Sequence, residues 1–130
     1  MHDLQFGFTK GGGCDKALLI FKSVVEYYNE RESTIFAAAL DLTKAYDRLN
    51  HCVLILKLCK IGIPGDLIML FMFWFQNLCG VVVWGNNESL RFNIRSGVRQ
   101  GGVCSCWLFN IYVNDLVIRL EKQWFRLYDV

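Results

Sequence analysis

Four apolar stretches of this chain predict helices, with polar residues or helix-breaking residues between them. In the first stretch one face is apolar and the opposite face carries lysines and glutamates, which is typical of an amphipathic helix. Gly62 and Pro64 separate the second and third stretches, because a glycine and a proline end one helix and the proline can begin the next. The four predicted helices cover residues 15–29, 53–61, 65–77 and 105–121.

Two other parts of the chain have the pattern of β-strands. Residues 34–42 form a short, continuous apolar run after a polar turn, which predicts a central strand that is buried on both faces. Residues 81–84 and 90–94 predict a hairpin around a turn at residues 85–89, and the second arm alternates between apolar and polar side chains. The inward-facing residues of that arm are predicted to be Leu90, Phe92 and Ile94. Helices mixed with an antiparallel hairpin predict the α+β class.

The composition is unusually apolar for so short a chain. Of the 130 residues, 54% are hydrophobic and 15% are aromatic, so we expect part of the surface to pack against the rest of a larger fold. The net charge of +2 neither requires nor excludes nucleic acid as a partner. The strongest apolar run, residues 67–75, is shorter than the ~20 residues of a membrane span, and we therefore predict no membrane association.

The cysteines carry no recognisable metal or disulfide pattern. The sequence has six cysteines but no C-x-x-C pair and no pair of histidines at zinc spacing. The first residues lack the pattern of a signal peptide, so we expect none. We therefore expect reduced and mostly buried thiols in an intracellular protein of the nucleus or cytoplasm that is not secreted.

Asp41 is the first candidate for chemistry, because it ends the predicted buried strand. A carboxylate in that position is costly unless it is paired or binds a cation, and Mg²⁺ prefers such oxygen ligands. The alternative is structural: Asp41 begins a helix or pairs with Lys44, and Asp47 in the following polar turn pairs with Arg48 or caps a helix. No two aspartates are adjacent anywhere in the chain.

A glycine-rich loop before the last predicted helix is the second candidate. Arg99 and Gln100 precede Gly101 and Gly102, and glycines let a backbone approach a bulky partner while a helix start offers free N–H groups to anions. Such a loop suits a nucleotide or a nucleic-acid backbone. A turn that merely caps a core helix is the alternative, and the loop taken alone favours neither.

Together these two segments resemble motifs A and B of reverse transcriptases, most of all those of non-LTR (LINE-type) retrotransposons. Residues 39–51 (ALDLTKAYDRLNH) are similar to motif A, and residues 96–116 (SGVRQGGVCSCWLFNIYVNDL) to motif B. Residues 5–13 resemble the fingers motif. The resemblance implies that residues 1–130 are a partial reverse transcriptase domain, an α+β fragment of the fingers and palm of a right-hand polymerase. Helices would pack on an antiparallel sheet, and the thumb is absent.

For catalysis, the resemblance implies that Asp41 is a metal ligand for Mg²⁺ and that the Leu42 carbonyl lies beside a second metal ion. Motif C, the aromatic-x-Asp-Asp turn that completes such a site, is missing from the sequence. Tyr128 and Asp129 are a poor substitute with one carboxylate. We therefore expect this chain to be inactive as a polymerase when alone.

For substrate binding, the resemblance implies roles for six residues. Those expected to bind the nucleotide are Tyr46, Gln100, Gly101 and Lys10, and those expected to contact the template are Arg99 and Gly102. Tyr46 would lie under the incoming sugar and exclude a 2′-hydroxyl, while Lys10 would approach the triphosphate. The implied partners are an RNA template, a DNA primer, deoxynucleoside triphosphates and the rest of a longer retrotransposon polyprotein.

The sequence also departs from the family pattern. Cys104 stands where motif B usually has leucine, and Cys106 where it usually has proline. The main expectation is a fragment of an RNA-directed DNA polymerase. The alternatives are a catalytically dead remnant that binds RNA or primer-template, and a non-functional copy of a decayed element. A Mg²⁺-dependent nuclease that uses Asp41 and Asp47 is disfavoured because a third acid is lacking.

Overall fold

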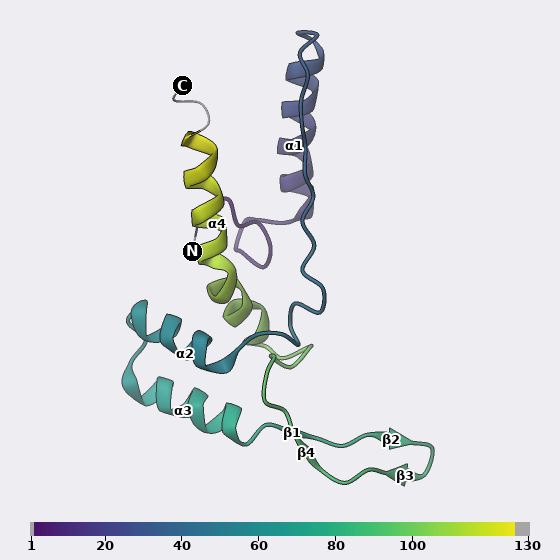
Figure 1. Cartoon of the computed structure of the whole chain (residues 1–130), viewed down its shortest axis with the longest axis vertical. Coiled ribbons are helices and arrows are strands. Elements are labelled where there is room, and N and C mark those ends of the chain that lie inside the picture. Colours follow the sequence, from purple (N-terminus) through teal and green to yellow (C-terminus); the bar gives the residue numbers. More distant parts are fainter. Residues whose placement is uncertain (1, 127–130) are drawn as a thin grey trace. The chain divides into compact units, whose positions relative to one another are not determined.

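A computed structural model describes residues 2–126 of the chain (Figure 1). These residues form four helices and four strands of two residues each. They divide into two compact units, one of residues 44–112 and one of residues 2–43 with 113–126. Helices and antiparallel strands occur together, as expected for the α+β class. The right-hand polymerase arrangement and the division into fingers motif, motif A and motif B stay predictions.

In residues 44–112, two helices pack against each other as a pair: α2 (His51–Lys60) and α3 (Gly65–Gln76). Asn50 caps α2, since its side-chain oxygen accepts a 3.1 Å hydrogen bond from the Val53 amide. Gly62 follows α2 with a φ of +82°. Pro64 is the N-cap of α3, so both helices and the break between them confirm the predictions.

The buried core lies within residues 44–112. Its side chains come from the turn before α2, from α2 and α3, from the loop before α4 (Ser105–Arg126) and from the first turns of α4. Burying one such leucine stabilises a fold by roughly 1.5–3 kcal/mol. The core residues are Leu49, Leu54, Leu58, Ile68, Phe75, Val98, Leu108 and Ile111.

The strands form two narrow antiparallel ribbons. β1 (Cys79–Gly80) pairs with β4 (Phe92–Asn93), and β2 (Val83–Trp84) pairs with β3 (Asn87–Glu88). The hairpin was therefore predicted correctly, but its second arm begins closer to the turn than expected. The predicted inward face is wrong for Leu90, which is 91% exposed, and for Phe92, which is 48% exposed. The reason is that no helix packs on either ribbon within residues 2–126.

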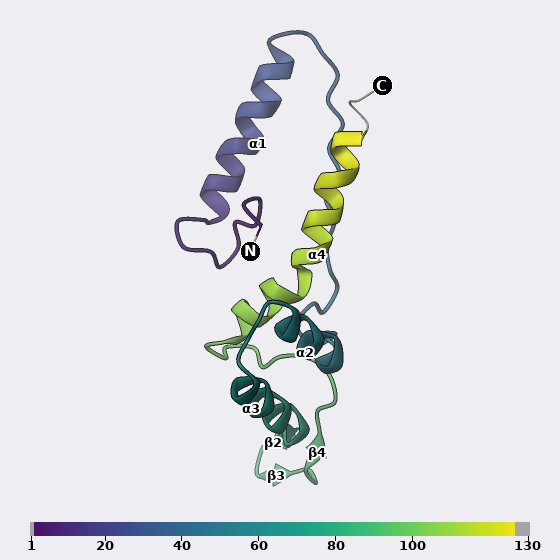
Figure 2. The same ribbon diagram turned by 90° about the vertical axis from the view of Figure 1, so that its left-hand side faces the viewer.

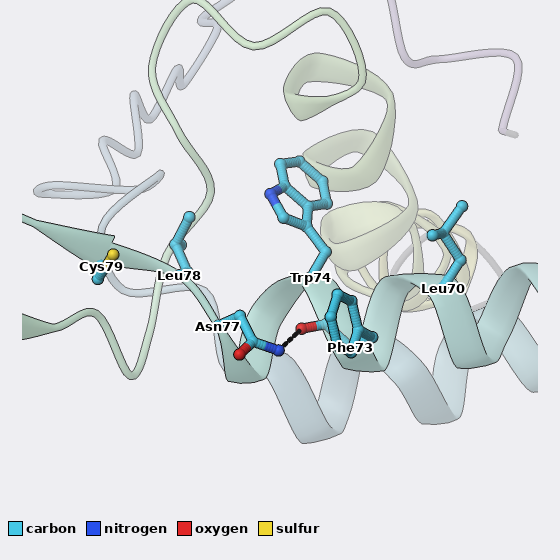
Figure 3. A pocket seen from close by; sticks show the side chains of 6 residues that line it. All are labelled: Leu70, Phe73, Trp74, Asn77, Leu78 and Cys79. Atoms are coloured by element: carbon cyan, nitrogen blue, oxygen red, sulfur yellow. Dashed lines mark hydrogen bonds between the residues drawn. The ribbon is translucent and has the colours of Figure 1, made fainter.

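The end of α3 adjoins an apolar hollow. Asn77 closes the helix, because its side-chain nitrogen donates a 2.7 Å hydrogen bond to the Phe73 carbonyl (Figure 3). Beside it is a hollow of about 490 Å³ whose walls continue into β1. None of the residues proposed for catalysis or binding lines this hollow. Its lining residues are Leu70, Phe73, Trp74, Asn77, Leu78 and Cys79.

In the other unit, α1 (Cys14–Asn29) forms where the sequence predicts a helix. None of its residues is buried, so the apolar face contacts no core. The predicted central strand at residues 34–42 is wrong: this segment is extended chain that joins no sheet (Figure 2). Phe36 is 87% and Leu40 is 78% exposed. A central strand needs neighbours on both sides, and the structure places no strand beside this segment within residues 2–126.

The last helix and the cysteines also refine the predictions. α4 runs to Arg126 rather than ending at residue 121. All six cysteines are free, as expected, but none is buried, which corrects the prediction of mostly buried thiols. Within residues 2–126, no helix has the length and apolar character needed to cross a membrane.

Candidate nucleotide and nucleic-acid site

The predicted motif A turn and motif B loop meet inside the unit of residues 44–112. Two backbone hydrogen bonds join them: the Gly97 amide donates to the Leu49 carbonyl at 2.7 Å, and the Val98 amide donates to the Tyr46 carbonyl at 2.9 Å. Leu49 and Val98 are themselves part of the buried core. The start of the predicted motif B segment is therefore fixed to the end of the predicted motif A segment by backbone contacts and by packing.

Gly97 makes this close approach possible. Its φ is +89°, a conformation that other residues rarely adopt. A Cβ atom there would lie 2.8 Å from the Asp47 Cα and 2.8 Å from the Tyr46 carbonyl oxygen, which is too close for either backbone atom to remain in place. Position 97 consequently requires glycine for two independent reasons, its backbone angle and the space around it.

Tyr46 is held between two residues at the start of α4. Its ring stacks on Phe109 with centroids 4.9 Å apart, and its hydroxyl donates a 3.5 Å hydrogen bond to the Cys106 sulfur. Burial, and secondarily the hydrogen bond and charge of Cys106, raise the pKa of Tyr46 to about 12. The hydroxyl is therefore protonated at neutral pH, and the ring has a defined position.

The glycine-rich loop forms a tight turn that leads into α4. The Arg99 carbonyl accepts hydrogen bonds from the Gly102 amide at 3.0 Å and from the Ser105 hydroxyl at 2.6 Å. A Cβ on Gly102 would lie 2.6 Å from that hydroxyl, and Gly101 has a φ of +80°. The loop therefore forms a turn that caps a core helix, which was one of the two interpretations of its sequence. The same turn leaves the side chains of Arg99 and Gln100 exposed.

A recess of about 650 Å³ lies between this loop and the β1–β4 ribbon. It holds one acidic and one basic side chain, Asp47 and Arg99, together with the amide of Gln100. Tyr46, Gly101 and Gly102 are not among its lining residues. The full lining is Asp47, Leu78, Cys79, Gly80, Val81, Ile94, Ser96, Gly97, Val98, Arg99 and Gln100. Arg99 and Gln100, which are neighbours in the sequence, therefore line one concave surface together with Asp47.

The remaining predicted residues belong to the other unit. Asp41 and Leu42 lie on the extended segment and are exposed, and Lys10 lies in an exposed loop. Within residues 2–126 no three His, Cys, Asp or Glu side chains gather closely enough to hold a metal ion. One exposed carboxylate and a carbonyl do not fit a Mg²⁺ site by themselves. Tyr128 and Asp129 lie outside the described residues.

His51 is a residue of this region to which the sequence assigned no role. Its Nε2 lies 2.6 Å from the Gly97 carbonyl oxygen, and its ring stacks on Phe75 with centroids 4.2 Å apart. In the sequence it is the last residue of the motif A segment and stands beside Cys52. Because its partner is 46 residues away, no local pattern indicates the contact.

Comparison with known proteins decides the family. Residues 1–129 match the family described as reverse transcriptase (RNA-dependent DNA polymerase). This chain is a reverse transcriptase family member. The motif-based resemblance is thereby confirmed, and this reverse transcriptase segment is also similar to curated proteins of non-LTR retrotransposons. No solved structure matches it.

Three relatives show the extent of the similarity. A Pol polyprotein of the type-1 retrotransposable element R2 from Popillia japonica is 26% identical over 82% of this chain. A Pol polyprotein of the type-2 retrotransposable element R2DM from Drosophila melanogaster is 28% identical over 92% of the chain. An RNA-directed DNA polymerase of the mobile element jockey from Drosophila funebris is 28% identical over 86% of the chain. The chain spans 18%, 11% and 12% of these three relatives. It is thus similar to a short part of longer retrotransposon proteins.

Proposed function

We propose that this segment supplies part of the nucleotide and template surface of an RNA-directed DNA polymerase from a non-LTR retrotransposon. The observation that carries the proposal is the recess beside the glycine-rich loop, where Arg99 and Gln100 stand together. Arginine is permanently charged and suits phosphate oxygens, whereas glutamine both donates and accepts hydrogen bonds. The bound partners would be an RNA template, a DNA primer and a deoxynucleoside triphosphate.

The support for this surface is its rigidity. Gly97 is joined to the motif A turn, the Arg99 carbonyl accepts two hydrogen bonds from the next turn, and Val98 is buried. The two exposed side chains therefore project from a fixed backbone. A binding group on a fixed backbone loses less conformational entropy when it binds. In this proposal Tyr46, held by Phe109 and Cys106, faces the sugar of the nucleotide.

Binding of nucleic acid tests the proposal directly. A labelled RNA template annealed to a short DNA primer is titrated with the 130-residue chain at several salt concentrations. We expect affinity to fall as salt rises, because phosphate contacts release counterions. Arg99→Gln should weaken binding several-fold and lower the salt slope by about one. Arg91→Gln is the matched control, since Arg91 is exposed on the hairpin ribbon and should leave binding unchanged.

Two results would contradict the proposal. One is the absence of salt-dependent binding even at the lowest salt concentration. The other is an equal loss of affinity in Arg99→Gln and Arg91→Gln, which would show that the chain attracts nucleic acid by its general positive charge and not through the loop.

Catalysis is a separate matter from binding. Two-metal phosphoryl transfer needs several carboxylates around ions ~3.5–4 Å apart, and Asp41 stands exposed without such neighbours within residues 2–126. We therefore expect the 130-residue chain to extend no primer when Mg²⁺ and deoxynucleotides are supplied. Incorporation directed by the template, lost in Asp41→Ala and retained in Asp66→Ala, would overturn this expectation and place the catalytic carboxylate at Asp41.

A further inference from the structure

His51 connects three elements of the segment. It is the first residue of α2, its ring lies nearly parallel to Phe75 of α3 at an interplanar angle of 13°, and its Nε2 contacts the Gly97 carbonyl. Phe75 is buried and therefore has little freedom to move. The imidazole is consequently held in a fixed direction with one nitrogen at the start of the motif B loop.

The peptide unit between Gly97 and Val98 is bound at both ends. Its carbonyl contacts His51 Nε2 at 2.6 Å, and its N–H donates to the Tyr46 carbonyl at 2.9 Å. A carbonyl can only accept a hydrogen bond, so Nε2 must carry the proton. Since glycine permits many backbone angles, the orientation of this peptide depends on those two hydrogen bonds more than on the intrinsic preference of Gly97.

We propose that His51 is a positioning residue that orients the Gly97–Val98 peptide and thereby the loop that carries Arg99 and Gln100. The effect on binding rests on the function proposed above. Loss of the Nε2 donor would leave the Gly97 carbonyl, which belongs to a buried residue, without this partner. Rotation of the peptide would also break the bond to Tyr46. Arg99 follows the peptide by one residue, so such a rotation changes where its side chain starts.

A space-filling role for His51 is the competing explanation, and two substitutions separate it from positioning. His51→Phe keeps an aromatic ring against Phe75 but removes the donor. His51→Gln removes the ring but retains an amide N–H that reaches about as far as Nε2. Positioning predicts that glutamine preserves the loop and phenylalanine does not. Space filling predicts the reverse order.

The experiment measures amide hydrogen exchange and primer-template affinity in the 130-residue chain and both variants. In His51→Phe we expect exchange at Val98 to accelerate about tenfold, exchange within α3 to stay unchanged, and affinity to fall several-fold. His51→Gln should restore most of both quantities. The proposal would be overturned if His51→Phe had the same exchange rate at Val98 and the same affinity as the wild-type chain. It would also be overturned if His51→Gln restored neither quantity.

A measurement on the unmodified chain covers the case in which a variant fails to fold. Long-range ¹H–¹⁵N correlation of the imidazole reports which ring nitrogen carries the proton in neutral His51. We expect Nε2, and a proton on Nδ1 alone would overturn the proposal. If the wild-type chain binds no primer-template at low salt, the proposed function fails, while the exchange and imidazole measurements still decide whether His51 orients the loop.

Discussion

At the scale of single residues, the glycines of the motif B segment serve different purposes. Gly97 lies against the backbone of Tyr46 and Asp47, whereas Gly101 has a positive φ with no atom within 4 Å of the place of a Cβ. Gly102 is confined by the Ser105 hydroxyl. A glycine-rich loop usually indicates flexibility or ligand access, but here neighbouring backbone atoms require glycine at position 97, and a side chain at position 102 would have to displace the Ser105 hydroxyl.

Replacement of Gly97 tests the junction between motifs A and B. In Gly97→Ala, the positive φ costs about 1–2 kcal/mol and the collision with Asp47 and Tyr46 costs about 1–3 kcal/mol more. Gly62→Ala is the matched control, because Gly62 has a φ of +82° and open space around it. This variant should be destabilised only by the cost of the positive φ. The free energy of unfolding from urea titrations measures both.

Equal destabilisation by the two substitutions would show that the backbone angle is the whole requirement at position 97. It would also mean that motif B can move away from the motif A turn at little cost. The arrangement of the recess, which Asp47 and Gly97 both line, would then be adjustable rather than fixed.

Cys106 shows how a departure from the family pattern acts on a neighbouring residue. Motif B of reverse transcriptases usually has proline at this position, and a proline side chain accepts no hydrogen bond. In this chain the Cys106 sulfur accepts one from Tyr46 and contributes to its raised pKa. The substitution therefore adds a contact to the residue predicted to lie under the incoming sugar.

At the scale of elements, helices were predictable because their signals are local. Gly62 and Pro64 act within a few residues of the helix ends that they determine, and the apolar residues of α2 and α3 lie close together in the sequence itself. The turn into α4 was predictable for the same reason. A short window of sequence contains all the information that these elements need.

Strands depend on distant partners, and there the sequence was less informative. The run at residues 34–42 has the composition of a buried strand, but no other segment pairs with it within residues 2–126. The hairpin was predictable because its turn and both arms are contiguous. The inward face of the hairpin was not predictable. An inward face exists only where other residues cover it, and the alternation of apolar and polar residues does not show whether such a layer is present.

In the candidate site, too, local features were predictable from the sequence and distant contacts were not. Arg99 and Gln100 were predictable as a pair, because they are neighbours in a loop whose glycines mark it. The contacts of Gly97 with Tyr46, Leu49 and His51 span about 50 residues and have no local signal. What the sequence missed is therefore the junction that holds the predicted binding residues in place.

At the scale of the whole molecule, apolar residues fall into two groups. The fully buried ones lie between Leu49 and Ile111, whereas large apolar side chains are exposed on α1 and the segment after it, and also on α3 and the β-ribbons. The chain covers 18% or less of the three relatives described above. Contiguous apolar surface of this kind is rare on monomers and usually contacts another protein surface.

This distribution predicts that the chain combines cooperative unfolding with exposed apolar surface. We expect it to bind a hydrophobic dye and to self-associate with rising concentration, because α1 presents apolar side chains with no core to cover them. Phe21→Lys should reduce both effects without lowering the free energy of unfolding, since Phe21 is 54% exposed. Light scattering, dye fluorescence and urea titration measure the three quantities.

Leu58→Ala provides the opposite control. Leu58 is fully buried, so its truncation should lower the free energy of unfolding by about 2–5 kcal/mol and increase dye binding by exposing the core. A molten chain would also bind dye, but it would lose the cooperative transition and would respond equally to both substitutions. A monomeric, dye-negative wild-type chain would show instead that α1 and the segment after it find a cover within these 130 residues.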